Sequence, residues 1–519
     1  MQRVSILWAD DEIELLKPHI LLLEQKNYRI TPVNSGYDAI ELVGKEHFDI
    51  VFLDENMPGI TGLEALEKIK KINSRIPVVM ITKSEEENVM DEAIGGQIAD
   101  YLIKPVNPNQ ILLSIKKIID SGRLVSENVT SKYRQGFVDL SMRVNERMSH
   151  DEWLALYKDL VFWELELEKA QENSMQEILI EQKAEANRNF GKHVASNYVG
   201  WIKDPDNAPI LSHNAFARKV SPLLRRKEKP VLLLVIDNLR FDQWEVLKSR
   251  LAEFYTTKED GLYTGILPTA TQYARNAFFA GLTPYEISKR FPDKWLNDDD
   301  EGGKNQHEEF FLNDLLKRLR LDLKASYHKI IKQEQGKNLA DSIVNQLKTN
   351  DLTVVVYNFI DMLSHARTDM EVIKELAEDE AAYRSLTLSW FDHSPLFDLL
   401  KNAATQDFQL VVTTDHGSIR VKKPVKIVGD RNTTTNLRYK QGRNLNYNHK
   451  EVIEFRKPEE EAGLPKSNLS SVYVMSYPED YFVYPNNQNY YVNFYKNTFQ
   501  HGGASLEEML IPFAILNPK

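Results

Sequence analysis

Five apolar runs of strand length alternate with amphipathic helical patterns over residues 1–121. The runs are VSILWA (4–9), YRITPV (28–33), DIVFL (49–53), PVVMI (77–81) and ADYLI (99–103). The stretches between them, such as EIELLKPHILLLEQ (12–25), repeat apolar residues at helical spacing. Strands that alternate with helices predict a doubly wound parallel sheet, which carries its chemistry beyond the carboxyl ends of its strands.

The pattern changes twice further along the chain. Over residues 122–205 apolar residues recur at helical spacing with little Gly or Pro, which predicts a helical bundle or linker. Over residues 206–519 buried-strand patterns return, the strongest being VLLLVI (231–236), TVVVYNFI (353–360) and QLVVTT (409–414). Helical patterns lie between these runs. The sequence therefore predicts an α/β multidomain protein with a helical middle domain and a large second α/β domain.

Composition excludes several classes of protein. A chain of 519 residues is too long for one hydrophobic core. Its net charge of −11 gives no overall basic surface for nucleic acid, so a direct DNA-binding role is disfavoured. The absence of cysteine excludes disulfides and thiolate metal ligands. No apolar run reaches the ~18 residues of a membrane span, and we expect a cytoplasmic protein.

Residues suited to phosphoryl transfer gather at the predicted strand ends of residues 1–121. They are Asp10 and Asp11 after the first strand, Asp54 after the third, Thr82 at the end of the fourth and Lys104 after the fifth. Carboxylates hold Mg²⁺, and one of them can act as the nucleophile. A lysine balances the incoming charge, and a hydroxyl can hydrogen-bond the transferred group. The set indicates transfer of a phosphoryl group to Asp54.

The motifs DDE (10–12), LDENMPGITG (53–62), ITKS (81–84) and YLIKP (101–105) resemble the receiver domains of two-component response regulators. The resemblance implies that Asp54 is the phospho-acceptor and that a sensor histidine kinase is a partner. It implies one Mg²⁺ held by Asp11, Asp54 and the backbone carbonyl of Asn56, with Asp10 beside it. Thr82 and Tyr101 would form the switch pair, and Lys104 would be the cation of the site. The face formed by residues 86–120 would control formation of a homodimer.

Metal-capable side chains recur where the strands of residues 206–519 should end. They are Asp237, Thr271, Asp361, His365, Asp415, His416 and His501. Zinc takes His nitrogen and carboxylate oxygen, usually with four ligands. Asp361 and His365 are four residues apart, so one helical turn would bring them to the same side. We expect two zinc ions, one bound by Asp361, His365 and His501 and the other by Asp237, Asp415, His416 and the Thr271 hydroxyl.

Thr271 is the natural nucleophile of such a site, because metal coordination lowers the pKa of a hydroxyl. Thr269 lies two residues earlier and stays an alternative. The stretch QYARNAFFAG (272–281) predicts a helix whose first N–H groups would point at a bound phosphate. Arg275 and Asn276 in that helix are candidate substrate contacts.

The order D…PTxT…DxxxH…DHG…HGG is similar to the alkaline phosphatase superfamily, and specifically to its PglZ branch. The resemblance implies that two zinc ions and a Thr or Ser nucleophile hydrolyse phosphate mono- or diesters through a covalent phospho-enzyme. We favour a phosphodiesterase acting on nucleotides or oligonucleotides. A receiver, a helical middle and a PglZ domain in one chain resemble the response regulators of type IX secretion. That implies a PorY-like kinase, and a sigma factor or secretion component, as partners.

Two alternatives remain open from the sequence. The segment 422–444 clusters cations, among them Arg431, Arg438, Lys440 and Arg443, and would either steer an oligonucleotide or form a solvated basic hairpin. The second domain would alternatively be a non-catalytic, zinc-stabilised interaction module that binds a sigma factor or secretion component, because one scaffold can serve binding or catalysis.

Overall fold

The computed structural model describes most of the chain as two compact units, Met1–Lys132 and Tyr133–Lys519. The described residues are 4–73, 76–82, 98–170, 173–298, 300–369, 375, 377, 379–430, 433–468, 470–486 and 488–519, without the side chains of 119–128, 131, 173 and 365–369. Within this described part, no helix is long and apolar enough to cross a membrane.

The first unit is built on a five-stranded parallel sheet in the order β2-β1-β3-β4-β5. Its strands are β1 (Ser5–Ala9), β2 (Arg29–Val33), β3 (Ile50–Asp54), β4 (Val78–Thr82) and β5 (Asp100–Ile103). Its helices are η1 (Ile13–Leu16), α1 (Lys17–Gln25), α2 (Gly36–Val43), α3 (Gly62–Ile72) and the first part of α5 (Pro108–Asn145). Successive strand residues point to opposite faces of the sheet, so two separate apolar cores form. Leu53 packs in one core and Phe52 in the other.

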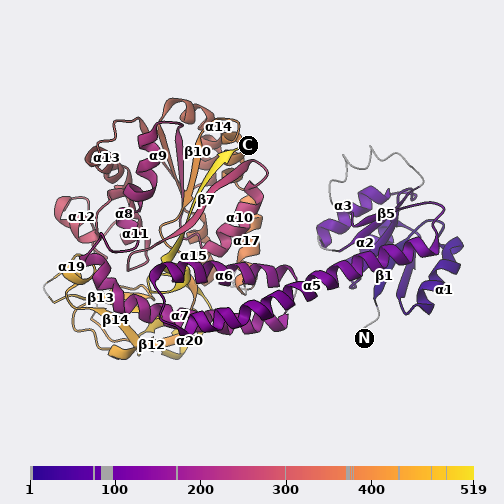
Figure 1. Ribbon diagram of the computed structural model, residues 1–519, viewed down its shortest axis with the longest axis horizontal. Helices are drawn as coiled ribbons and strands as arrows, with labels where there is room; N and C mark the ends of the chain where they lie inside the picture. Colours follow the sequence, from indigo (N-terminus) through magenta and orange to yellow (C-terminus); the bar gives the residue numbers. More distant parts are fainter. Residues whose placement is uncertain are drawn as a thin grey trace. The chain divides into compact units, whose positions relative to one another are not determined.

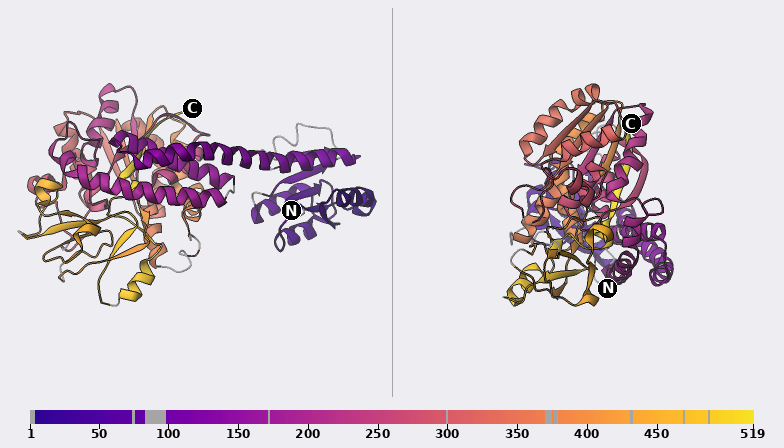
Figure 2. Two further views of the ribbon diagram at one scale, coloured as in Figure 1. Left: turned by 60° about the horizontal axis from the view of Figure 1, so that its bottom comes forward. Right: turned by 90° about the vertical axis from the view of Figure 1, so that its left-hand side faces the viewer.

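The second unit begins with long helices. The end of α5 is followed by α6 (His150–Lys169) and α7 (Asn173–Lys203), and α6 and α7 lie side by side (Figure 2). A capping box between Ser149 and Glu152 starts α6. Trp153 of α6 packs edge-on against Phe190 of α7, with ring centroids 5.5 Å apart. The predicted helical middle domain is confirmed.

A six-stranded sheet in the order β7-β18-β10-β6-β9-β8 forms the centre of the second unit, with helices on both faces (Figure 1). The strands are β6 (Val231–Ile236), β7 (Tyr255–Thr264), β8 (Ala325–Ile330), β9 (Leu352–Tyr357), β10 (Gln409–Thr413) and β18 (Leu510–Pro518). Strands β8, β9, β6 and β10 are parallel, whereas β18 and β7 run antiparallel to their neighbours, so the sheet is mixed. Strands β6, β9 and β10 are buried along their whole length, as the continuous apolar runs predicted.

Helices and small sheets complete this unit. The helices before β10 are α8 (Ser212–Ala215), η2 (Phe216–Val220), α9 (Ser221–Arg226), α10 (Phe241–Leu251), α11 (Thr271–Ala280), α12 (Pro284–Arg290), α13 (Glu308–Arg318), α14 (Gln333–Thr349), α15 (Phe359–Asp369), α17 (Glu380–Asp392) and α18 (Pro395–Ala403). Between β10 and β18 lie β11 (Ile419–Arg420), β12 (Lys423–Lys426), β13 (Tyr439–Gly442), η3 (His449–Glu451), β14 (Val452–Phe455), α19 (Pro458–Glu461), β15 (Val472–Ser476), β16 (Asp480–Val483), α20 (Gln488–Tyr495), β17 (Phe499–Gln500) and α21 (Leu506–Met509). The strands of this insertion form a cap subdomain, residues 419–500, made of three small sheets.

Candidate functional sites

The first candidate site lies at the carboxyl ends of β1 and β3. Asp10 and Asp54 are buried there and Asp11 is exposed, and one carboxylate oxygen of each lies within 4.8 Å of the others. Lys104 Nζ lies 3.0 Å from Asp10 Oδ2 and 2.9 Å from Asp54 Oδ1. Burial raises the pKa of Asp54, the hydrogen bond from Lys104 opposes this, and the Asp10 charge adds to it. Three carboxylates against one lysine suit a divalent cation with oxygen ligands.

The remaining receiver residues lie around this cluster. The Thr82 hydroxyl, at the end of β4, donates to the Glu55 carboxylate. Asn56 is exposed, and the ring of Tyr101 is 45% exposed. Within the face predicted to control dimerisation, residues 86–97 lie outside the described residues. The structure therefore gathers the acids and Lys104, with Thr82 at the next strand end.

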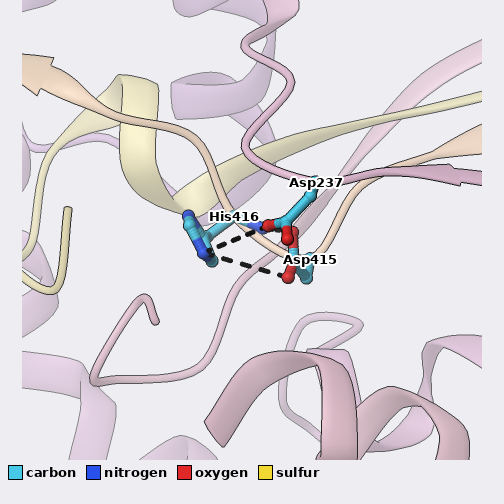
Figure 3. Close-up of side chains that lie close together, drawn as sticks. All are labelled: Asp237, Asp415 and His416. Atoms are coloured by element: carbon cyan, nitrogen blue, oxygen red, sulfur yellow. Dashed lines mark hydrogen bonds and ion pairs between the residues drawn. The ribbon is translucent and has the colours of Figure 1, made fainter. Parts of the chain in front are cut away.

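The second candidate site lies where β6 and β10 end. Asp237 follows β6, Asp415 and His416 follow β10, and their ligand atoms lie within 4.8 Å of one another (Figure 3). His416 Nε2 is 3.9 Å from Asp237 Oδ1 and 3.8 Å from Asp415 Oδ2. His416 Nδ1 is 3.1 Å from the Gly417 carbonyl. Because a carbonyl only accepts, Nδ1 carries the proton and Nε2 presents its lone pair to the carboxylates.

Thr271 is the first residue of α11 and faces this cluster. Its Oγ1 is 3.0 Å from His416 Nε2 and 3.4 Å from Asp237 Oδ1. The Thr269 hydroxyl is fully buried, donates to the Gly503 carbonyl at 2.8 Å and accepts from the Gly502 N–H at 3.0 Å. Thr269 therefore anchors the loop that carries His501, and Thr271 is the hydroxyl that faces the acids.

Of the other predicted ligands, His501 lies against His416 and Asp361 lies beside His501. The His501 ring stacks on the His416 ring with centroids 4.2 Å apart. His501 Nε2 is 3.7 Å from Asp361 Oδ1, and His501 Nδ1 is 3.1 Å from the Thr269 carbonyl, so Nε2 again presents its lone pair to a carboxylate. His365 belongs to α15 with Asp361, but its side chain lies outside the described residues.

The electrostatics of this cluster fit a bound cation. Burial raises the pKa of Asp237 to about 6, the Arg275 charge opposes the shift, and Asp415 adds to it. Asp415 Oδ2 is buried and has no hydrogen-bond donor among the described residues. The His416 lone pair faces two buried carboxylates and the His501 lone pair faces the partly buried Asp361 carboxylate, an arrangement that zinc ligation satisfies. The Asp, His and Thr side chains here fit the zinc that the sequence predicts.

Three parts of the chain match known protein families. Residues 215–515, more than half of the chain, match the BREX system PglZ alkaline phosphatase-like domain. The chain belongs to the PglZ family. Residues 6–116 match the response regulator receiver domain, and residues 123–202 match the PorX response regulator linker domain. The chain thus has a PorX-like arrangement of a receiver and a PglZ effector.

Two curated relatives each match about a quarter of this PglZ protein. Transcriptional regulatory protein ZraR of Klebsiella oxytoca is 33% identical over 129 residues, 25% of this chain and 29% of the relative. A CpxR homolog of Haemophilus influenzae is 32% identical over 129 residues, 24% of this chain and 55% of the relative. The chain therefore spans less than two thirds of these curated relatives.

Among solved structures, a CheY-like receiver domain protein from Methanospirillum hungatei is 28% identical and covers 23% of this chain and 96% of its own, with a TM-score of 0.22. Vibrio cholerae CheY4 is 26% identical and covers 22% of this chain and 99% of its own, with a TM-score of 0.21.

Sequence reasoning missed the support of the PglZ site. Arg275 is 1% exposed; its Nη1 donates to Asp237 Oδ2 at 2.7 Å and its Nε donates to Glu308 Oε1 at 2.6 Å. Lys329 Nζ lies 3.0 Å from Glu308, and Tyr327 donates to the same carboxylate. The guanidinium thus turns Asp237 Oδ1 toward Thr271. No local sequence pattern predicts this support, because Arg275 and Glu308 are 33 positions apart.

The two predicted substrate contacts lie behind the PglZ site. Asn276 is 2% exposed, and its amide donates to the Gln272 carbonyl at 2.9 Å and to the Lys304 carbonyl at 3.1 Å. Arg275 is committed to Asp237 and Glu308. Substrate contact by either residue stays a prediction, and this burial disfavours it.

The basic segment 422–444 is not one basic surface. Arg438 is fully buried and pairs with Glu508, and Lys440 is 1% exposed and donates to the Thr434 carbonyl at 2.8 Å. Arg443 is exposed, and Arg431 lies outside the described residues. Two of the four cations therefore support the fold, and steering of an oligonucleotide by the segment stays a prediction that exposed Arg443 can test.

Proposed function

We propose that the chain is a response regulator whose PglZ domain is a zinc-dependent phosphodiesterase with Thr271 as its nucleophile. The observation that carries this is the placement of the Thr271 hydroxyl 3.0 Å from His416 Nε2 and 3.4 Å from Asp237 Oδ1, at the first turn of α11. A hydroxyl beside lone-pair donors and carboxylates is where a nucleophile is activated.

Two zinc ions would be held by the side chains already described. One set is Asp237, Asp415, His416 and Thr271, and the other is Asp361, His365 and His501. Bound zinc lowers the pKa of a hydroxyl and neutralises the charge that develops on phosphate oxygens. Thr271 Oγ1 attacks phosphorus to form a phosphothreonine, the bond to one ester alcohol breaks, and the proton lost from Oγ1 ends on the departing alkoxide. Water then cleaves the phosphothreonine bond and releases a phosphomonoester.

The elements around Thr271 suit an anionic substrate. Helix α11 has ten residues, and its first N–H groups lie beside the hydroxyl, so its positive end would stabilise phosphate oxygens. Thr271 itself is only half-buried, unlike its ligand neighbours. We propose nucleotide or oligonucleotide phosphodiesters as its substrates.

Hydrolysis of an aryl phosphodiester tests the nucleophile. With zinc bound, Thr271→Ala should lose about a thousandfold or more in kcat, whereas Thr271→Ser keeps a hydroxyl and most of the rate. Zinc content measured on both variants checks that the metal remains. An Ala variant as active as the wild-type chain would remove Thr271 from the mechanism. An aryl monophosphate run in parallel tests the preference for diesters.

We also propose that the receiver controls this activity. Asp54, with one Mg²⁺ held by Asp11, Asp54 and the Asn56 carbonyl, would take its phosphoryl group from a PorY-like sensor histidine kinase. The match to the PorX linker domain supports a role in type IX secretion through a sigma factor or secretion component. We propose that Thr82 and Tyr101 form the switch pair. The Thr82 hydroxyl now donates to Glu55 and would turn toward the phosphoryl group after phosphorylation.

Phosphorylation should favour a homodimer. An acyl-phosphate donor with Mg²⁺ should raise the dimer fraction in sedimentation, and Asp54→Ala should block the rise. The Thr271→Ala variant is the matched control, because its receiver is intact and it should still dimerise. A dimer fraction that ignores the donor in the wild-type chain would contradict receiver control.

A further inference from the structure

Two adjacent carboxylates, Glu507 and Glu508, hold the loop that carries His501, and each contacts a different part of the domain. We name residues 501–509 the ligand loop. Glu508 pairs with Arg438 of the cap subdomain through two hydrogen bonds of 3.1 and 2.5 Å, and it also accepts the Gly503 N–H at 2.8 Å. Glu507 points instead toward helix α7. Both carboxylates are buried, at 3% and 0% exposure, so each needs its partners.

Two side chains of helix α7 bind the Glu507 carboxylate. Asn187 is 3% exposed, and its amide nitrogen lies 3.2 and 3.0 Å from the two Glu507 carboxylate oxygens. Its amide oxygen accepts the Leu506 N–H at 2.9 Å, so one side chain holds both backbone and carboxylate of the ligand loop. Lys183 Nζ lies 3.2 Å from Glu507 and 2.8 Å from Glu164.

Residues 506–508 of the ligand loop pack directly against Gly417, the residue that follows His416. A side-chain carbon at Gly417 would lie 2.1 Å from the Glu507 carbonyl oxygen, so only glycine fits there. The Gly417 N–H donates to the Glu508 carbonyl at 3.2 Å. Gly417 in turn fixes the His416 ring through its own carbonyl. A shift of residues 506–508 would therefore move Gly417 and the His416 ring. His501 is the first residue of the same loop.

We propose that Asn187 and Lys183 are positioning residues for the PglZ site, which makes helix α7 of the PorX-type linker region a structural part of that site. They act through Glu507 on the ligand loop and so set His501 against His416. The catalytic meaning of this rests on the proposed phosphodiesterase function, whereas the hold on the loop does not.

Hydrogen exchange on the metal-free full chain tests the hold itself. Asn187→Asp puts a second carboxylate against Glu507, and the Gly503 and Leu506 amides should then exchange about tenfold faster or more. The control is Asn197→Asp, the same change at an exposed position of the same helix, where the amide donates to the His193 carbonyl. It should leave the loop unchanged.

A charge swap separates a specific hold from general damage. In the double variant Asn187→Asp with Glu507→Gln, the new carboxylate accepts from the new amide, and the Leu506 N–H keeps its acceptor. Slow exchange should return, to within about threefold of the wild-type rate. Glu507→Gln alone is the milder probe if Asn187→Asp fails to fold, and it should speed exchange because the hydrogen bonds from Asn187 lose their charged acceptor and Lys183 keeps only Glu164.

Zinc affinity and kcat then read the consequence at the site. Loss of a partner behind a ligand typically costs about 10–100-fold in metal affinity or activity, and we expect that range for zinc in Asn187→Asp, with recovery in the double variant. Competition with a chelating dye gives the affinity without any turnover. Unchanged exchange and unchanged zinc affinity in Asn187→Asp would overturn the proposal. A chain that shows the exchange effect but never hydrolyses a phosphodiester would instead refute only the proposed function.

Discussion

Both candidate sites lie at the carboxyl ends of parallel strands, but their cations are placed differently. In the receiver, Lys104 Nζ contacts Asp10 and Asp54, the proposed phospho-acceptor, and remains 14% exposed. In the PglZ domain, Arg275 contacts Asp237 from behind and is itself anchored by Glu308. One cation meets the reacting carboxylate, and the other holds a carboxylate that is proposed to bind metal.

The two cations suit different tasks: Lys104 suits a site whose bound group changes, and Arg275 suits a site whose carboxylate keeps one orientation. A lysine is a flexible point charge, so Lys104 can follow a phosphoryl group that is added and removed. A guanidinium forms two directed bonds in a plane, so Arg275 fixes the carboxylate it touches. Asp237, which faces Thr271 with one oxygen and Arg275 with the other, is oriented whether or not a substrate is present.

Exchanging one carboxylate in each site should give the largest and cleanest contrast. Asp237→Asn should lower phosphodiester hydrolysis about a thousandfold, because a charged ligand disappears, and should leave phosphoryl uptake unchanged. Asp54→Asn should abolish phosphoryl uptake and leave the zinc content of the chain unchanged. Uptake measured with a labelled phosphoryl donor, together with metal analysis, reads both. Loss of both activities in either variant would contradict two independent sites.

Removing the two cations should have smaller and unequal effects on hydrolysis. Arg275→Met should lower kcat about 10–100-fold at saturating zinc, because Asp237 loses its orientation. It should also lower the melting temperature, because buried Glu308 keeps its charge without its arginine. Glu308→Gln keeps the guanidinium but weakens its anchor, so the kcat of this variant should lie between those of the wild-type chain and Arg275→Met. Lys104→Met is the matched receiver control, and hydrolysis by the unphosphorylated chain should not change.

The strand-end rule explains what could be predicted from the sequence. Asp237 and Asp415 follow buried apolar runs, and such strands end at one edge of the sheet, so their meeting follows from the pattern. The chemical roles of these residues stay predictions. The supporting residues could not be found in the same way. Asn187 and Glu507 are 320 positions apart, and charged or amide residues in helices usually face solvent.

The pH dependence of zinc binding tests the burial of Asp237. Its pKa of about 6 in the fold exceeds its ordinary value of 3.8, so the folded, metal-free chain holds a proton there between these pH values. This group therefore stabilises the fold at low pH, and that contribution is lost as the pH rises through 6. Zinc must displace the same proton, so its affinity should rise about tenfold per pH unit up to pH ~6 from this group alone.

Calorimetric titration of zinc in buffers with different ionisation enthalpies counts the protons released. Histidine ligands release protons too, so the share of Asp237 is the difference between the wild-type chain and Asp237→Asn at pH 5. Equal proton release by both proteins would contradict a raised pKa at Asp237.

Lys440 completes the comparison as a buried cation whose hydrogen bond goes to the Thr434 carbonyl rather than to a carboxylate. Burial lowers its pKa to about 7, against an ordinary 10.5, so the unfolded chain binds more protons and stability should rise between pH 7 and pH 10. Lys440→Met should remove this rise and increase the melting temperature by a few degrees at pH 7. Because the side chain is buried, hydrolysis of an oligonucleotide should stay within about twofold, whereas exposed Arg443→Ala tests steering by the same segment. A large loss of oligonucleotide hydrolysis in Lys440→Met with an unchanged melting temperature would mean that this ammonium reaches substrate after all.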